Sequence, residues 1–504
     1  MKRMDDFGRS RSMSTGGAGE QRLSSRLLDG RALSQWQFLV VLGVALATAV
    51  AVVVVFVVLR FDDPAERVNA DVPAASPLYV PPLLTADRSE GAARFDLSIG
   101  RSTHQFVGGV DTDTISYNGL GLLGPTLEVW AGERVQIDVT NELDGVTTTH
   151  WHGADLPAAA DGGPHSTIEP GETWSPEFDV IQPAATLWYH PHRKDLTAEQ
   201  VYLGGAGMLI VRDDNELAAS LPQTYGVDDI PVILQDRNFT PDGQLDFAID
   251  PAGRGRHMET LTVNGTIDPF IEVPSGLVRL RLLNGSQARV YDLSVDGSPM
   301  HKIASDGGYL EAPVELERLD LAPGDRAEII IDVGTEPIAL LDANFDRVLE
   351  LRPNGEEPAD TALPVKLADI DRITDDEIAV DRTFEMKQEG DHWGINGEIM
   401  DMGVVNETIK FGDTERWTIT VDNGQHVFHV HQTQFQILSI NGKPPPPEDA
   451  GWEDSVWVNG NREVVIAARF DTYTNPDIPY MFHCHVLDHE DLGMMGQFQV
   501  LEQP

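Results

Sequence analysis

Cysteine and basic residues are both scarce in this chain of 504 residues. Its single cysteine, Cys484, cannot form a disulfide within the chain. Lysine and arginine number 36 against 81 aspartates and glutamates, a formal net charge of −45. A surface so poor in cations excludes a nucleic-acid-binding protein, because a phosphate backbone requires a cationic face.

The composition is otherwise that of a globular protein. Apolar residues make up 41% and charged residues 23% of the chain, which excludes a disordered or fibrous protein. The length exceeds what one hydrophobic core needs and indicates about three domains.

One long uncharged run lies near the N-terminus. Residues 38–59 are dominated by Val, Ala and Leu and are long enough to span a bilayer as a helix. The mildly basic residues before it favour the cytoplasmic side, which places everything after Arg60 outside the cell. We expect a cytoplasmic leader at 1–37, an uncleaved transmembrane anchor at 38–59 and a linker at 60–90. A cleaved signal peptide is the alternative.

An extracytoplasmic location bears on both the charge and the cysteine. The acidic surface is explained most simply by solubility, and attraction of cationic substrates or metal ions is the second explanation. Outside the cell a lone thiol is a liability unless something binds it. A metal ion is the natural candidate for Cys484.

A strand pattern recurs three times after residue 90. Short alternating apolar runs, broken by turn residues, predict an all-β architecture of sandwiches. The repeated unit begins at Gly132, at Gly276 and, more loosely, at Gly412, a domain-sized spacing. We expect three β-sandwich domains at 91–215, 216–380 and 381–504. The acidic stretch 347–385 is the expected linker between the second and the third.

Ten of the 15 histidines fall in four short clusters. The clusters are Thr-His-Trp-His-Gly at 149–153, Trp-Tyr-His-Pro-His at 188–192, His-Val-Phe-His-Val-His at 426–431, and His-Cys-His at 483–485, followed by His489 and Met494. One His-x-His pair is a weak signal, but four of them indicate metal binding. Neutral imidazole is the commonest metal ligand, and unsatisfied polar rings are costly in a packed interior.

Strand parity divides the ligands between two sites. Residues two apart in a strand share a face, so Cys484 points away from its two neighbours. One face collects His429, His431, His483 and His485, and the opposite face collects Cys484 and His426. Two metal sites joined by one peptide segment are therefore predicted.

The Cys484 site can be completed by His489 and Met494. Two histidines, a thiolate and a weak axial methionine form the ligand set of a blue-copper electron-transfer centre. Zinc is the competing metal, but a structural zinc site needs no weak thioether. Met494 as core filler and Met495 as the axial ligand are alternatives, and the spacing favours Met494.

The other site gathers eight imidazoles, too many for one copper and suited to three. They are His150, His152, His190, His192, His429, His431, His483 and His485. Half come from the first expected domain and half from the third, so we expect this cluster at their interface.

These clusters resemble, in order and spacing, the copper-binding signatures of the multicopper oxidases. The likeness is greatest to three-domain bacterial enzymes of the laccase and copper-efflux-oxidase type. It covers about residues 95–504 and includes Asp-Gly-Gly-Pro at 161–164 and Glu-Asp-Leu-Gly-Met-Met at 490–495. The resemblance implies a fold of three Greek-key cupredoxin sandwiches and four coppers per chain.

The resemblance also implies residue roles. The type 1 copper ligands would be His426, Cys484, His489 and Met494, and the type 2 ligands His150 and His429. The type 3 pair would be bound by His152, His190, His192, His431, His483 and His485. Electrons would pass from Cys484 through His483 or His485 to the trinuclear cluster, where dioxygen is reduced to water. Asp161 and Glu490 match the family's proton donors, with solvated loop acids as the alternative reading.

The sequence departs from the family pattern in two places. The usual proline of the third motif is Val427, and the methionine-rich insert of copper-efflux oxidases is absent between Met300 and Met386. We therefore expect a laccase-like oxidase of phenols or aromatic amines with dioxygen as acceptor. A Cu(I) or Fe(II) oxidase in copper tolerance is the alternative, and a copper-binding scaffold without turnover is the third hypothesis. The expected state is a single-pass membrane protein, monomeric, with extracytoplasmic catalytic domains.

Overall fold

A computed structural model describes residues 75–502 apart from 90, 251–254, 357–360, 390–391 and 461. The expected leader and the expected anchor at 38–59 lie outside the described residues. Within the described part, no helix has the length and apolar character required to cross a bilayer.

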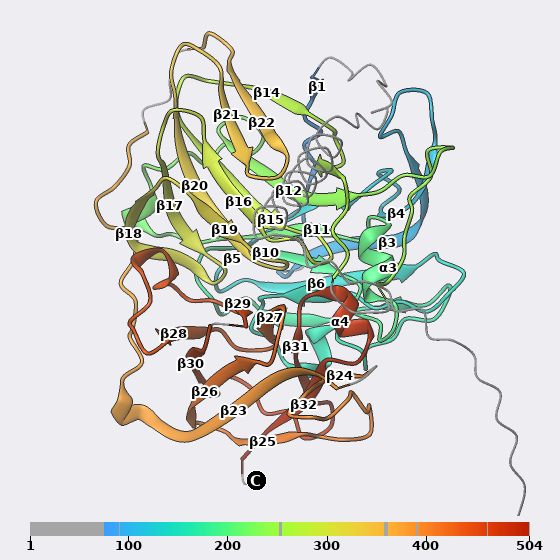
Figure 1. Cartoon of the computed structure of the whole chain (residues 1–504), viewed down its shortest axis with the longest axis vertical. Coiled ribbons are helices and arrows are strands. Elements are labelled where there is room, and N and C mark those ends of the chain that lie inside the picture. Colours follow the sequence, from blue (N-terminus) through green and yellow to red (C-terminus); the bar gives the residue numbers. More distant parts are fainter. Residues whose placement is uncertain are drawn as a thin grey trace, which may run out of the picture. The chain divides into compact units, whose positions relative to one another are not determined.

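Six β-sheets form three pairs along the chain (Figure 1). In the first pair, one sheet has the strand order β2 (Leu83–Leu84), β5 (Thr126–Trp130), β11 (Gly207–Arg212), β10 (Ala185–His190) and β7 (His150–His152). The other sheet has the order β4 (Thr112–Tyr117), β3 (Ala93–His104), β6 (Arg134–Asn141) and β8 (Thr173–Trp174), and β9 (Glu177–Asp179) also pairs with β6.

In the second pair, one sheet has the strand order β1 (Ser76–Pro77), β14 (Pro269–Val273), β22 (Asp346–Pro353), β21 (Ile338–Asp342), β16 (Tyr291–Val295) and β19 (Leu319–Leu321). The other sheet has the order β13 (Thr260–Val263), β12 (Asp229–Arg237), β15 (Gly276–Asn284), β20 (Arg326–Val333), β17 (Met300–Ser305) and β18 (Gly308–Leu316). In the third pair, one sheet has the strand order β24 (His392–Ile395), β23 (Ile378–Glu389), β26 (Thr414–Val421), β30 (Val464–Arg469) and β28 (Phe435–Ile440). The other sheet has the order β25 (Glu407–Lys410), β32 (Met495–Leu501), β31 (Tyr480–Cys484), β27 (Gln425–Val430) and β29 (Ser455–Asn459).

The same strand pairings recur in each third. The repeated sequence unit forms β6, β15 and β26, and these pair in parallel with β3, β12 and β23. In the partner sheets β5, β14 and β25 pair in parallel with the last strand of their own third, β11, β22 and β32. The all-β sandwich fold expected from the alternating runs is confirmed.

Alternation along the strands builds one core for each pair of sheets. In β6, Val135, Ile137 and Val139 are buried while the residues between them are more exposed. Burying each such side chain contributes about 1.5–3 kcal/mol. Separate hydrophobic clusters fill the first, second and third pairs of sheets.

Two segments expected to be linkers contain strands. β22 and the start of β23 lie within 347–385, and β1 and β2 lie within 60–90. The alternation in β22 was masked by its charges, because Arg347 and Arg352 both pair with Glu350 beside the buried Leu349 and Leu351. The two segments are therefore not free of regular structure at these places. β1 and β2 have two residues each, too few for a periodic signal.

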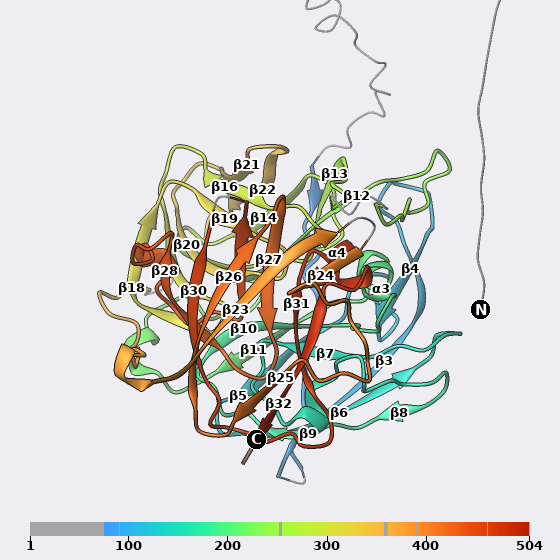
Figure 2. The same ribbon diagram turned by 60° about the horizontal axis from the view of Figure 1, so that its bottom comes forward.

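Among the described residues, three short α-helices lie in the connections between strands: α2 (Ala158–Asp161), α3 (Thr197–Tyr202) and α4 (Leu487–Asp491). Figures 1 and 2 both show α4 beside α3. The Asp491 carboxylate accepts hydrogen bonds from the backbone N–H groups of Thr197 and Ala198 at 3.1 and 2.9 Å. This contact fixes the start of α3 against the helix that carries His489.

Candidate metal centres

Two antiparallel strand pairs position most of the clustered histidines. In the first third, His150 of β7 lies opposite His190 of β10. In the last third, His429 of β27 lies opposite His483 of β31. The ends of these pairs meet face to face, since the ring of His152 stacks on that of His429 with centroids 3.8 Å apart. Residues nearly three hundred positions apart thus share one interior site.

The eight histidines of this site fall into three groups whose ligand atoms lie within 4.8 Å of one another. The groups are His152, His190 and His485; His192, His431 and His483; and His150, His152 and His429. All eight side chains are buried. The structure therefore brings together the full set that the sequence predicted for this site.

Three imidazoles of the site are each held by their Nδ1 atom. His150 Nδ1 and His429 Nδ1 donate to the carbonyl oxygens of Asp161 and Asp454, each at 2.8 Å, and His190 Nδ1 donates to that of Pro191 at 2.9 Å. Such contacts fix the tautomer and leave the other nitrogen as the ligand.

The opposite nitrogens of these rings lack partners among the described residues. His150 Nε2, His190 Nε2 and His429 Nε2 are buried without a hydrogen bond, and so is His152 Nδ1. Buried polar atoms are rarely left unsatisfied in a folded protein. A metal ion bound by these atoms accounts for the pattern, so the donor set fits the expected metal.

Burial also favours the metal-binding protonation state. It lowers the pKa of His190 to about 3 and holds the pKa values of His150, His152 and His485 well below the usual range. These rings are therefore neutral at physiological pH, which is the form that binds a metal.

The two carboxylates expected to be proton donors both touch the histidine groups. Asp161 Oδ2 accepts a hydrogen bond from His431 Nδ1 at 2.9 Å. Glu490 places its two oxygens 3.4 Å from His192 Nδ1 and 3.3 Å from His483 Nδ1. The exposed fraction is 4% for Asp161 and 0% for Glu490, so neither is a solvated loop acid.

Cys484 belongs to a separate site. Its Sγ lies 3.5 Å from His426 Nδ1 and 3.4 Å from His489 Nδ1, and the two nitrogens are 3.1 Å apart. Burial raises the pKa of the Cys484 thiol to about 12, so its thiolate requires a bound cation. Met494 is buried in the same hydrophobic cluster, and its carbonyl accepts the Cys484 N–H at 3.0 Å.

Sequence reasoning did not find three residues that support these sites. Asp454 Oδ1 accepts a hydrogen bond from His152 Nε2 at 2.9 Å, and Arg326 Nη1 donates to the same oxygen at 2.8 Å. Ser455 Oγ lies 3.2 Å from His429 Nδ1. No local motif marks Asp454, Ser455 or Arg326, because their partners lie far away in the sequence.

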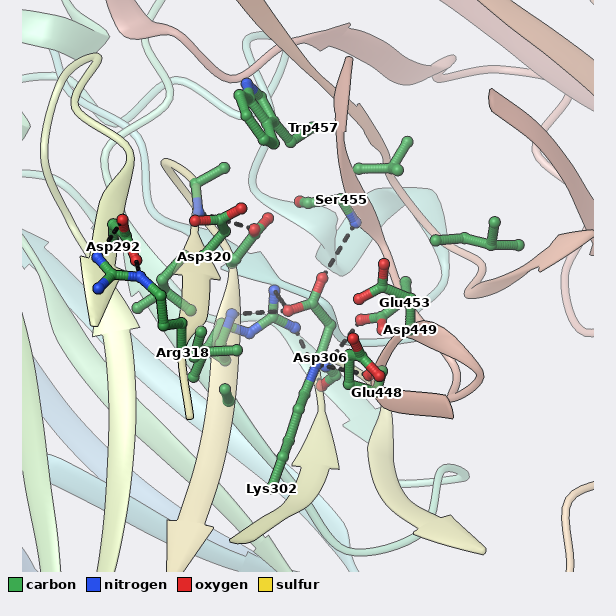
Figure 3. A pocket seen from close by; sticks show the side chains of 18 of the residues that line it. Asp292, Lys302, Asp306, Arg318, Asp320, Glu448, Asp449, Glu453, Ser455 and Trp457 are labelled. Carbon is green, nitrogen blue, oxygen red and sulfur yellow. Dashed lines mark hydrogen bonds and ion pairs between the residues drawn. The ribbon is translucent and has the colours of Figure 1, made fainter. Parts of the chain in front are cut away.

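A polar cavity of about 380 Å³ lies beside these supporting residues (Figure 3). Asp306 lies at its centre between Lys302 and Ser455, and it accepts the Ser455 N–H at 3.2 Å. Burial raises the pKa values of Asp306, Asp325 and Glu453. Among the described residues, no trio lining this cavity brings its ligand atoms as close together as the histidine groups do. The cavity thus borders the polar network around Arg326.

A second cavity, of about 540 Å³, opens at the Cys484 site. His426 and His489 lie in its wall with Trp393, Trp457 and His257. The remaining lining residues are Gln388, Asn423, Gly424, Gln425 and Asn459. The described lining contains no carboxylate, although the chain as a whole is strongly acidic.

Comparison with known proteins places this geometry in a family. Three sequence models described as multicopper oxidase match residues 98–216, 253–340 and 373–504. The chain is 36% identical over 452 residues to the cell division protein FtsP of Escherichia coli, which covers 85% of this chain and 93% of that protein. It is also 36% identical over 421 residues to the multicopper oxidase mco of Staphylococcus aureus, a match that covers 82% of this chain and 89% of that protein.

A solved structure gives the same result. A laccase-like multicopper oxidase from the lignin-degrading bacterium Ochrobactrum sp., with oxidase activity towards lignin model compounds, superposes with a TM-score of 0.80. It is 35% identical and covers 84% of this chain and 100% of its own. The chain thus belongs to the multicopper oxidase family and is an oxidoreductase with dioxygen as electron acceptor.

Proposed function

We propose that this protein is a laccase-like enzyme that takes single electrons from small aromatic reductants at the Cys484 site and reduces dioxygen to water at the histidine site. The observation that carries the proposal is the adjacency of the two sites. His483 belongs to one and Cys484 to the other, so a single peptide bond joins them. Copper bound there supplies one-electron acceptance at Cys484 and four-electron reduction of dioxygen at the three histidine groups.

The ligand assignment follows the groups in the structure. His426, Cys484, His489 and Met494 would hold the type 1 copper. His150 and His429 hold the type 2 copper. The type 3 pair is held by His152, His190 and His485 and by His192, His431 and His483. This arrangement requires four coppers per chain and is supported by the unpartnered imidazole nitrogens.

Asp161 and Glu490 serve as proton donors in this proposal. Each contacts histidines of the dioxygen site, and both are shielded from solvent. Burial raises the pKa of Glu490 well above its usual range, which favours the protonated form of that carboxyl. A protonated group beside the dioxygen site suits a reaction that consumes four protons.

The cavity at His489 favours aromatic reductants. Two tryptophans and several amide side chains line it, without a described carboxylate. Phenols and aromatic amines can pack on such a wall, whereas a Cu(I) or Fe(II) ion would meet only one imidazole outside the Cys484 site, that of His257, and no described carboxylate or sulfur ligand. Oxidation of Cu(I) or Fe(II) remains the alternative, with the acidic surface guiding the ion.

Oxygen consumption with matched reductants tests the substrate class. The purified protein is assayed side by side with 2,6-dimethoxyphenol, Cu(I) and Fe(II). The proposal expects the phenol to support turnover without added copper. A rate that appears only with Cu(I) or with excess copper supports the metal-ion oxidase instead.

A scaffold role without turnover is the third candidate, and the similarity to a protein named for cell division makes it worth testing. A copper-loaded protein that is blue but consumes no oxygen with any of these donors establishes that role. The complete ligand set weighs against it.

We further propose three cupredoxin domains at 91–215, 216–380 and 381–504. In this proposal residues 38–59 anchor them to the membrane, outside the cytoplasm, and the protein is a monomer that crosses the membrane once. The threefold recurrence of the strand pairings supports the domain division. The uncharged run supports the anchor.

A further inference from the structure

Trp393 of β24 covers one of the histidines of the Cys484 site. Its indole stacks on the imidazole of His489 with centroids 4.2 Å apart and ring planes inclined by 13°. It also lies 6.0 Å from the ring of His426. The side chain packs in the same hydrophobic cluster as Cys484 and Met494. Trp393 therefore lies within contact distance of the metal site's own ring system.

The same indole forms part of the wall of the 540 Å³ cavity. His489 and His426 lie in that wall too, but only 2% and 1% of their surfaces are exposed. A molecule in the cavity therefore meets little of either imidazole. Trp393 is also buried, at 4% exposed, but it lines the cavity and its indole face covers His489.

Trp457 of β29 offers a contrast in the same cavity. It lines the wall as Trp393 does, and the guanidinium of Arg462 lies 5.6 Å from its ring centroid. It also borders the polar cavity of Figure 3, where it lies at the end away from Lys302. Trp457 gives an aromatic wall, whereas Trp393 joins the wall to His489.

We propose that Trp393 is the electron-entry residue for aromatic reductants. A reductant bound in the cavity contacts the edge of the indole, and stacked π-systems at 4 Å provide a short path to His489. The reductant loses one electron, and a phenol also releases its hydroxyl proton to water. The electron passes to the oxidised Cys484 site, and Trp393 ends the step unchanged. This inference rests on the proposed function, which supplies the oxidised acceptor.

The test separates an effect on electron entry from an effect on binding of the reductant and from a change in the reduction potential of the copper. Reduction of the blue absorption band is followed anaerobically by stopped flow, with 2,6-dimethoxyphenol at increasing concentration and, separately, with hexacyanoferrate(II). The variants are Trp393→Leu, Trp393→Phe and the control Trp457→Leu. Because both reductants act on the same copper, the ratio of their limiting rates in one variant cancels any change of potential.

We expect Trp393→Leu to lower the limiting rate with the phenol at least tenfold relative to hexacyanoferrate(II), and Trp393→Phe to restore most of it. Trp457→Leu should raise the concentration of the phenol that gives half the limiting rate, but it should leave the limiting rate within twofold of the wild-type value. Equal slowing of both reductants, or no slowing of either, overturns the inference.

A copper-free measurement completes the test. Calorimetric titration of the copper-free protein with the redox-inert 1,2-dimethoxybenzene should show binding in wild type that weakens in Trp393→Leu. Equal binding in both overturns the contact between reductant and indole. Failure of the proposed function is a different result, since the protein would then show no blue band or would consume no oxygen with any donor.

Discussion

Asp454, which directly precedes β29, accepts a hydrogen bond from His152 of β7 at 2.9 Å, although 302 positions separate them. The same carboxylate binds the guanidinium of Arg326, which comes from β20 in the middle third of the chain. Arg326 in turn donates to the carbonyl of Thr186 at 3.0 Å. One buried ion pair thus links all three thirds of the chain beside the dioxygen site.

Replacing Asp454 by Asn should reduce both stability and copper binding. The change removes one of the two buried carboxylates that pair with the Arg326 guanidinium, the other being Asp306, and breaking a buried ion pair costs up to about 3–5 kcal/mol. It also removes the carboxylate that orients His152, and loss of such a partner lowers metal affinity about 10- to 100-fold. Chemical denaturation and copper analysis measure the two effects.

Arg318 provides the control for this ion pair. It pairs with Asp292 at the protein surface, with side chains 55% and 35% exposed. Arg318→Ala should leave both the unfolding midpoint and the copper content almost unchanged. Equal losses in Asp454→Asn and Arg318→Ala contradict the special role of the buried pair.

Glu490→Gln and Asp161→Asn should slow turnover without removing the blue copper. The amides keep the size of the side chains but cannot supply a proton, and loss of a proton donor costs about 10²- to 10⁴-fold in rate. Oxygen consumption should fall at least tenfold while anaerobic reduction of the blue band proceeds at the wild-type rate. If oxygen consumption stays at the wild-type level in both variants, the proton-donor assignment is wrong.

Asp155 should make the protein less stable as the pH rises. Burial raises the pKa of Asp155 to about 7, while its hydrogen bond from Thr472 opposes the rise. The native state therefore holds this proton more tightly than the unfolded chain, and stability falls from about pH 4 to about pH 7. The loss is about 2 kcal/mol, less than the full shift implies, because the carboxyl is partly exposed.

Asp155→Asn tests that sign. The variant keeps an oxygen that can accept from Thr472 but has no charge to bury. It should be more stable than wild type at pH 8 and equal to it at pH 4, as measured by denaturant unfolding at both values. A wild-type advantage at pH 8 contradicts the assignment.

The proposed anchor predicts a partition between membrane and soluble fractions. The full chain should sediment with membranes and resist extraction by high salt, and a chain starting at residue 73 should be released. Immunoblotting of the fractions measures this. If the chain expressed at full length is recovered in the soluble fraction as a product shortened at its N-terminus, the segment is a cleaved signal peptide instead.

Periodicity and spacing predicted the parts of the structure that depend on local sequence. The alternation in β6 and its repeats predicted the sandwiches, and parity predicted that Cys484 faces away from His483. The pairing of Arg326 with Asp454 and the stacking of Trp393 on His489 could not be predicted, because each joins segments distant in sequence. β22 was missed because its charged residues hide the apolar pattern, and their ion pairs with one another appear only in the structure.

Copper content measured together with the optical spectrum tests the central claim most directly. The account predicts four copper ions per chain, one for the Cys484 site and one for each of the three histidine groups, with an intense blue band. Cys484→Ser should lose the blue band, one copper and the oxidase activity together. A folded wild-type protein that binds fewer than four coppers, or a Cys484→Ser variant that stays blue, contradicts it.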